Sequence, residues 1–243
     1  MFSSAEPVRR FGRRAWLRGA AAVLAGIPCA GQQGRRLPPP EEPQADPGLQ
    51  SLLARMRSAV ASRDAAAVTA LMLPTFKVEF DVGKGPQVFR RYWKPEAGES
   101  PVWEILGRLL ALPGTPALPS LFCLPYLYMR FPRDLDPFAH VVAGADTSIR
   151  DRPGPDGAVA GNLNYSIVRL AEPLAPPVII PGGKFLAVDD PDAGHGYVAG
   201  SDVYSPAAHR MFFERRNGKW QWISLAAGTL ADPPELKRQP AKG

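Results

Sequence analysis

The stretch that decides the fold is TSIRDRPGPDGAVAGNLNYSIVRL, residues 147–170. A short segment ending at Ile149 and Arg150 runs into a turn rich in Pro, Gly and Asp, and a second segment leaves that turn. Pro, Gly and Asp mark turns, whereas the β-branched and aromatic residues around them favour strands. The stretch therefore predicts a β-hairpin. Similar short strands and turns are expected from His140 onward, in FLAVDD, HGYVAG and DVYS.

A second hairpin is predicted in RMFFERRNGKWQWISLAAG, residues 210–228. Asn217 and Gly218 both tolerate the positive φ angles of a two-residue primed turn, so the flanking strands are expected to pair around them. Both faces of the hairpin become apolar away from the turn, which predicts that its far ends are buried in a larger sheet. The expected opposite pairs are Phe213 with Trp222, Arg215 with Trp220, Phe212 with Ile223, Glu214 with Gln221, and Arg216 with Lys219.

The segment LQSLLARMRSAVASRDAAAVTALM, residues 49–72, is predicted to form two helices. Its apolar residues recur at helical spacing until Arg63 and Asp64, and Asp64 is a favourable cap for a second helix through Met72. A half-buried strand is expected at 75–83, where apolar and polar residues alternate. GPQVFRRYW and SPVWEILGRLLAL are predicted helices with Pro in the first turn. Residues 113–138 are expected to be mixed helix and loop.

The first 31 residues have the layout of an export signal peptide. Five arginines and one glutamate precede a short apolar stretch, which is followed by small residues. Arg13 and Arg14, with Trp16 and Leu17 behind them, resemble the twin-arginine translocation motif, although Gly12 stands where Ser or Thr is usual. An arginine-rich general secretory signal is the alternative. The apolar stretch is far shorter than the ~20 residues that span a bilayer.

Removal of this leader would change both the charge and the cysteine count. Cleavage is expected near Ala30 or Gly31, and Cys29 leaves lipidation open as an alternative. The formal net charge is +6, yet the chain beyond residue 31 has 24 basic and 22 acidic residues, so nucleic-acid binding is not expected. Only Cys123 would remain, in an apolar run, which predicts a buried thiol and no intramolecular disulfide. Residues 32–48 are predicted to be a Pro-rich linker and 229–243 a flexible tail.

The opening stretch and the strands after it resemble the bacterial SH3 domain of the SH3b type. The motifs that carry the resemblance are Ile149-Arg150, Gly154-Pro155, Phe185-Leu186-Ala187-Val188 and Gly196-Tyr197-Val198. Asn164 stands where the family usually has Gly, Phe185 where Trp is usual, and a Pro-rich insertion lengthens one loop. The resemblance covers residues 139–204 and implies a small β-barrel. Family members often bind cell-wall components or peptides, which makes Tyr165, Phe185 and Tyr197 candidate ligand-binding residues.

The flanking segments resemble nuclear transport factor 2-like proteins in architecture only, through two helices, an alternating strand and a closing Trp-rich hairpin. The predicted fold class is therefore α+β. Residues 49–138 plus 205–228 would form a cone-like α+β domain, with the barrel inserted before the C-terminal hairpin. The alternative is that this hairpin simply extends the barrel. A pocket in the cone-like domain would be lined by aromatic residues such as Tyr92, Trp93 and Trp103.

Candidate catalytic chemistry is sparse. His140 and His209 flank the predicted insertion and His195 lies in a turn, whereas a metal site needs more ligands at bond distance. DDPDAG, residues 189–194, has alternating oxygen ligands but lacks the distal Glu of a calcium loop, so an acidic turn is the better interpretation. Asp134 and Asp136 lie beside Pro or at a possible helix start. No nucleophile elbow, phosphate loop or zinc-protease motif occurs.

The combined prediction is an exported cell-envelope protein, periplasmic or otherwise outside the cytoplasm. It is expected to be a non-catalytic binding protein whose SH3b-like module recognises a cell-wall glycan, a peptide or a periplasmic partner protein. Neither a cofactor, a metal, nor a membrane-spanning segment in the mature chain is expected. The alternative is a small-molecule-binding protein or enzyme that uses a pocket in the nuclear transport factor 2-like domain.

Overall fold

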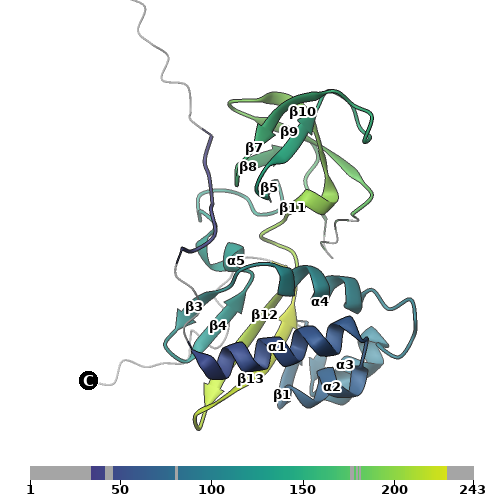
Figure 1. The fold of residues 1–243 in the computed structure, drawn as a ribbon, viewed down its shortest axis with the longest axis vertical. Coiled ribbons are helices and arrows are strands. Elements are labelled where there is room, and N and C mark those ends of the chain that lie inside the picture. Colours follow the sequence, from purple (N-terminus) through teal and green to yellow (C-terminus); the bar gives the residue numbers. More distant parts are fainter. Residues whose placement is uncertain are drawn as a thin grey trace, which may run out of the picture. The chain divides into compact units, whose positions relative to one another are not determined.

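A computed structural model describes residues 34–41, 46–79, 82–175, 178, 180 and 182–228. The predicted export signal with Arg13 and Arg14, the cysteine at position 29 and the tail at 229–243 lie outside these residues. The described strands form a six-stranded sheet, the first sheet, and a seven-stranded sheet, the second sheet. Helices pack against the first sheet (Figure 1), which confirms the α+β class. Among the described helices, none combines the length and apolar character that a membrane crossing requires.

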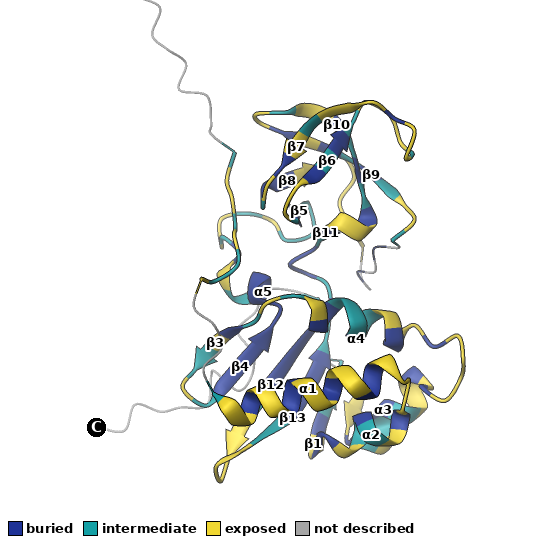
Figure 2. Cartoon of the chain, in the orientation of Figure 1, coloured by how far each residue is buried: buried dark blue, intermediate teal, exposed yellow. Residues whose placement is uncertain are grey.

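The two predicted N-terminal helices are present. Helix α1 spans Pro47–Ala61 and α2 spans Ala65–Ala70. The Asp64 side chain accepts a hydrogen bond from the backbone N–H of Ala67 at 2.8 Å, which confirms its role as a cap. Helix α2 ends at Ala70 because Met72 already begins a strand. Figure 2 shows α1 with one buried and one exposed side, as its apolar spacing predicts.

The first sheet has the strand order β2-β1-β13-β12-β4-β3. Strand β13 is parallel to β1, and β12 is antiparallel to β4. The hairpin of β12 and β13 therefore belongs to the first sheet, and the alternative that it extends the second sheet is wrong. The strands are β1 (Met72–Val78), β2 (Gly83–Lys84), β3 (Thr115–Leu118), β4 (Leu121–Leu124), β12 (Arg210–Arg216) and β13 (Lys219–Ala226).

The register of this hairpin follows the prediction near the turn and departs from it farther away. Asn217 and Gly218 have φ angles of 49° and 74°, as a primed turn requires. The four pairs nearest the turn form as predicted, from Arg216 with Lys219 to Phe213 with Trp222. Phe212 lies opposite Ser224 rather than Ile223, because the ladder shifts at a bulge next to Phe213.

Apolar side chains cover both faces of the first sheet. One face is covered by α1, α2, α3 (Pro86–Trp93) and α4 (Val102–Ala111). On this face the rings of Phe76 and Trp222 meet edge to face, with their centroids 4.6 Å apart. On the other face, Cys123 and Phe212 pack against Tyr128 of α5, Tyr126–Arg130. Cys123 is fully buried, and burial raises the pKa of its thiol above the ordinary value. The prediction that this cysteine packs in the core is confirmed.

Two predictions for this half of the chain were wrong. The strand expected at 75–83 begins at Met72 and ends at Val78, since Glu79 turns the chain with a φ of 47°. Val82 is consequently 39% exposed instead of lying on the inner face. The segment 113–138 contains β3 and β4 in addition to α5. Its prolines concealed these strands, but β3 is an edge strand, where Pro116 is tolerated.

The second sheet has the order β11-β5-β8-β9-β10-β6-β7. Val168, Val188 and Val198 are fully buried in its core together with Ile149. No pairing among the described strands joins the edge strands β11 and β7, so the sheet is open and the expected closed barrel is not shown. The strands are β5 (His140–Ala143), β6 (Thr147–Arg150), β7 (Val159–Leu163), β8 (Ile167–Leu170), β9 (Phe185–Asp190), β10 (Gly194–Ala199) and β11 (Val203–Tyr204).

The predicted linker is partly ordered. Residues 34–41, here called the N-terminal strap (purple in Figure 1), lie beside the second sheet, and Arg36 forms a β-bridge with Ser166. Ordered structure therefore begins before Leu49, and α1 itself begins at Pro47. Composition alone did not predict this order, because it depends on backbone hydrogen bonds and on one apolar residue, Leu37, which packs against a buried cluster.

Candidate functional site

Tyr165, one of the three predicted ligand-binding residues, lines a cavity of about 210 Å³. Two more tyrosines line the same cavity, Tyr126 at the start of α5 and Tyr204 in β11. Sequence reasoning missed these two, because only the fold brings three such distant positions together. This cavity is here called the tyrosine groove. Its other lining residues are Pro39, Leu112, Pro113, Leu127, Val142, Ala143, Gly144 and Ala145.

The N-terminal strap forms part of the lining of the tyrosine groove through Pro39, and it is hydrogen-bonded to Tyr165, Ile167 and Tyr126. The backbone N–H of Leu37 donates to the Tyr165 carbonyl at 2.8 Å, and the N–H of Ile167 donates to the Arg35 carbonyl at 2.7 Å. The Tyr126 hydroxyl donates to the Leu37 carbonyl at 2.6 Å. The Leu37 side chain packs with the buried cluster that contains Tyr126 and Ile167. The strap thus contributes both backbone and apolar contacts to the groove.

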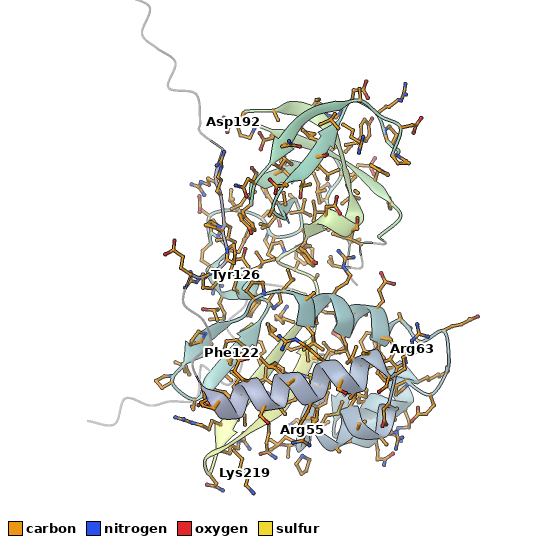
Figure 3. All side chains as sticks on the ribbon, in the orientation of Figure 1. Arg55, Arg63, Phe122, Tyr126, Asp192 and Lys219 are labelled. Atoms are coloured by element: carbon orange, nitrogen blue, oxygen red, sulfur yellow. The ribbon has the colours of Figure 1, made fainter. Side chains whose placement is uncertain are left out.

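The ends of the strap make polar contacts. Arg35 Nη1 lies 2.7 Å from Asp134 Oδ2, and this hydrogen bond is the main cause that lowers the pKa of Asp134. The backbone N–H of Gly34 donates to Asp192 Oδ2 at 3.3 Å. Figure 3 labels Tyr126 and Asp192, two of the residues that the strap contacts.

Tyr126 is held in its neutral form. Burial, with a smaller contribution from Tyr165, raises the pKa of Tyr126 to about 12. A neutral phenol can donate a hydrogen bond, whereas a phenolate cannot. The hydroxyl therefore remains available as a donor to the strap carbonyl across the physiological pH range.

Phe185 and Tyr197, the other predicted ligand-binding residues, lie on the outer face of the second sheet. Tyr197 pairs with Ala187, two residues after Phe185, and both aromatic side chains are half-buried. Tyr197 also pairs with Arg150 across the β10–β6 ladder. Phe185 and Tyr197 are therefore diagonal neighbours on adjacent strands, a position in which Cα atoms are ~7–8 Å apart. Neither residue belongs to the lining of the tyrosine groove.

A second cavity is lined by His209, which is paired with a carboxylate outside the lining. His209 Nε2 lies 3.0 Å from Glu79 Oε1, and Glu79 Oε2 accepts the backbone N–H of Ala227 at 2.9 Å. His209 is nearly fully buried, lies 5.4 Å from the Trp93 ring and lines a largely apolar cavity of about 80 Å³, the His209 pocket. Other lining residues are Pro101, Glu104, Ile105, Arg108, Leu109, Pro125, Val178, Ile180, Val203, Tyr204, Ser205 and Ala208.

The predicted pocket aromatics are not in the lining of the His209 pocket. Tyr92 is 48% exposed on α3. Trp93 and Trp103 are buried in the core, and Trp103 donates from Nε1 to the Pro95 carbonyl at 2.9 Å. Only Trp93 adjoins the pocket, through its contact with His209. Glu79 is 130 positions from His209, so no local sequence pattern indicated their contact.

The remaining candidate residues have structural partners. His195 Nδ1 lies 2.9 Å from Asp189 Oδ1 on the exposed side of β9 and β10, and His140 Nδ1 lies 2.8 Å from the Asp136 carbonyl. The carboxylate of Asp190 accepts the backbone N–H groups of two turn residues, in agreement with an acidic turn at 189–194. In the described part of the chain, no group of His, Cys, Asp and Glu side chains could hold a metal ion.

Comparison with known proteins finds no matching protein-family model and no matching curated protein. Solved structures with some similarity include an NTF2-like protein with a cystatin-like fold from Novosphingobium aromaticivorans, at 11% identity and a TM-score of 0.28, covering 78% of this chain and 84% of that chain. An NTF2-like protein from Pseudomonas putida KT2440 has 11% identity and a TM-score of 0.26, covering 77% and 87%. A cystatin-like protein from Nostoc punctiforme has 12% identity and a TM-score of 0.22, covering 74% and 86%. At these values the likeness carries no conclusion about this chain.

Proposed function

We propose that this chain is an exported cell-envelope protein whose second sheet is a non-catalytic binding module of the bacterial SH3 type. The observation that carries this proposal is the tyrosine groove, where Tyr126, Tyr165 and Tyr204 line one cavity. Tyrosine combines a large apolar ring with a hydroxyl, which suits it to contact peptides, sugars and protein surfaces. A binding function requires such a surface, whereas a catalytic function requires reactive groups arranged around it.

The proposed partner is a cell-wall component or a periplasmic protein, and the proposed location is the periplasm or another site outside the cytoplasm. Arg13 and Arg14 and the apolar stretch behind them support export through the twin-arginine route. The motifs around Ile149-Arg150 and Gly196-Tyr197-Val198 support the relationship to bacterial SH3 domains.

Retention of the purified protein on isolated cell wall and on immobilised periplasmic extract tests this function. We expect retention on one of them, and a roughly tenfold loss of retention for Tyr165→Asn, which removes an aromatic contact of order 1 kcal/mol or more. Asn is chosen because Tyr165 has a φ of 55°, a conformation that Asn tolerates. Tyr92→Ala, a change at an exposed tyrosine of α3, is the matched control and should leave retention unchanged. Absence of retention on both materials would overturn the proposal.

The second candidate function is the binding of a small molecule in a nuclear transport factor 2-like domain, favoured by His209, which lines the His209 pocket and is hydrogen-bonded to Glu79. Its volume of about 80 Å³ is smaller than the roughly 150 Å³ cavity that holds benzene in another protein, so a suitable ligand is smaller than benzene. The imidazole would orient a polar group of that ligand. Titration with acetone and 2-propanol, followed by the NMR signals of the His209 ring, tests this. Unchanged signals at saturating concentrations would remove this candidate.

A further inference from the structure

We propose that a third cavity, lined by residues of α1, β4 and the N-terminal strap, binds a free α-amino acid with an apolar side chain. The cavity has a volume of about 210 Å³ and is here called the strap pocket. Its site and its ligand differ from those of the proposed function, so the two proposals stand or fall separately. The argument for an amino acid comes from an apolar floor and from two opposite charges at the rim.

The floor of the strap pocket is apolar. Leu53 of α1 lines it together with Phe122 and Leu124 of β4, and each of these residues is at most 3% exposed. Gly114 lets the chain between α4 and β3 pass directly against the Phe122 ring, because a Cβ at Gly114 would lie 2.3 Å from Phe122 Cζ. The volume exceeds the roughly 150 Å³ of a cavity that holds benzene in another protein. A side chain of the size of leucine or phenylalanine therefore fits this floor.

The rim of the strap pocket is polar and exposed to solvent. Gln50 and Arg57 lie three residues before and four residues after Leu53, a spacing that places all three on one side of α1. Glu41 comes from the strap. A guanidinium only donates hydrogen bonds, whereas a carboxylate only accepts them. The rim therefore offers a cationic donor and an anionic acceptor above the apolar floor.

Arg57 is oriented by the fold. Its Nε atom donates to the Leu110 carbonyl near the end of α4 at 3.3 Å, which uses one of the five N–H donors of the guanidinium. Among the described residues, neither Arg57 nor Glu41 has an oppositely charged partner within 4.0 Å. The Nη groups of Arg57 can therefore bind a carboxylate with two parallel hydrogen bonds, the strongest form of this pair.

A free amino acid with an apolar side chain complements the floor and both charges of the rim at once. Its α-carboxylate pairs with Arg57, its α-ammonium donates to Glu41, and its side chain occupies the apolar floor. Both charged groups are attached to the same carbon atom, so one small molecule bridges the two rim charges. This arrangement, apolar walls with a few polar groups that fix orientation, is typical of small-molecule sites. A fatty acid or a simple amine leaves one rim charge unpaired, which supplies selectivity against both.

Titration of the full chain with L-leucine and with L-phenylalanine, followed by isothermal titration calorimetry, tests this proposal. We expect saturable binding of at least one of them, with a Kd below about 1 mM. Three analogues of leucine should each bind at least tenfold more weakly than leucine does. Glycine lacks the apolar side chain, 4-methylpentanoate lacks the ammonium group, and 3-methylbutylamine lacks the carboxylate. Absence of saturable binding for both amino acids, or equal binding of leucine and 4-methylpentanoate, would overturn the proposal.

Two variants separate the charged contacts. Glu41→Gln should weaken amino-acid binding at least tenfold and leave 4-methylpentanoate binding unchanged, because that analogue has no ammonium group to lose. Arg57→Gln should weaken amino-acid binding equally and leave 3-methylbutylamine binding unchanged. Arg55→Gln on α1 (Figure 3) and Glu99→Gln before α4 remove the same charges at exposed positions outside the lining, and neither should change binding. Equal losses in a variant and its control would contradict the assigned contacts, and the comparison of analogues on the wild-type chain needs no variant.

Discussion

Arg150 stands at the end of β6, where its guanidinium faces the adjacent turn. Its Nη1 atom donates to the Gly157 carbonyl at 2.6 Å, so this arginine bonds the adjacent turn. A hydrogen bond from a charged group contributes about 1.5–3 kcal/mol when buried, and less at a half-buried position. Arg150→Ala is therefore expected to lower the free energy of unfolding by about 1 kcal/mol, measured by urea denaturation.

Arg152 offers the matched control for this change. It lies two residues farther along, its side chain is 63% exposed, and its ion pair with Asp156 spans 3.7 Å. Arg152→Ala should leave the free energy of unfolding within about 0.5 kcal/mol of wild type. If Arg150→Ala instead abolished ligand retention while the melting temperature stayed unchanged, Arg150 would be a ligand-binding residue.

Tyr126 provides a pH-dependent prediction at the same scale. An unperturbed tyrosine has a pKa of about 10, whereas burial raises the pKa of Tyr126 to about 12 in the folded chain. A raised folded-state pKa means that the neutral phenol stabilises the fold. This contribution is complete below about pH 10 and is lost as the pH rises through about 12. Tyrosinate absorbance can be titrated in wild type and in Tyr126→Phe, and subtracting the second curve from the first isolates the titration of Tyr126. We expect its midpoint above pH 11, whereas a midpoint near pH 10 would contradict the burial argument.

At the scale of single strands, Gly196 determines how closely β10 approaches β6. A methyl group at this position would lie 2.6 Å from Ile149 Cγ1 and 2.7 Å from the Arg150 carbonyl oxygen. Both distances are too short for real contacts, so the strands must separate. Gly196→Ala should lower the free energy of unfolding by about 1–3 kcal/mol in chemical denaturation. Gly183→Ala is the control, because a Cβ added there would have no neighbouring atom of the described residues within 4 Å. Equal effects of the two changes would refute the packing argument.

Elements with strong local signals were the predictable ones. The helix break at Asp64 and the turn at Asn217-Gly218 each depend on a few adjacent residues, and both form as predicted. The strands β3 and β4 were missed because tertiary pairing overrides the local effect of prolines at an edge. The bulge beside Phe213 was missed for a related reason, since a ladder shift is set by packing on both strands.

The candidate site was less predictable than the elements. Tyr165 was identified through its place in the SH3-like segment, but Tyr126 and Tyr204 join it only through the fold. The order of the strap was also hidden, because proline-rich composition predicts a linker and the backbone partners of the strap lie far away in the sequence, at residues 165–167. Sequence patterns report local preferences, and this groove consists of contacts between distant segments.

At the scale of the whole described chain, the second sheet is formed by residues that lie between β4 and β12 of the first sheet. One arginine, on a helix that packs against the first sheet, bonds directly to segments of the second sheet and its loops. Arg108 of α4 donates to the carbonyl groups of Ile180, Gly200 and Val203 at 2.7, 2.9 and 3.1 Å. Its guanidinium also lies 5.1 Å from the centroid of the Tyr204 ring. Because Tyr204 lines both the tyrosine groove and the His209 pocket, Arg108 supports a wall that the two cavities share.

Removal of Arg108 is therefore expected to weaken the coupling between the two sheets. Arg108→Ala leaves three carbonyl groups without this donor, and we expect a loss of about 2–4 kcal/mol in the free energy of unfolding, because charged hydrogen bonds contribute about 1.5–3 kcal/mol each and do not add fully. Uncoupled parts unfold separately, so differential scanning calorimetry of the variant should resolve two transitions where wild type has one. Arg108→Lys should recover less than half of the loss, because an ammonium group cannot present the planar donor fork of a guanidinium. An Arg108→Ala chain with a single transition at the wild-type temperature would show that the two sheets are coupled by other contacts.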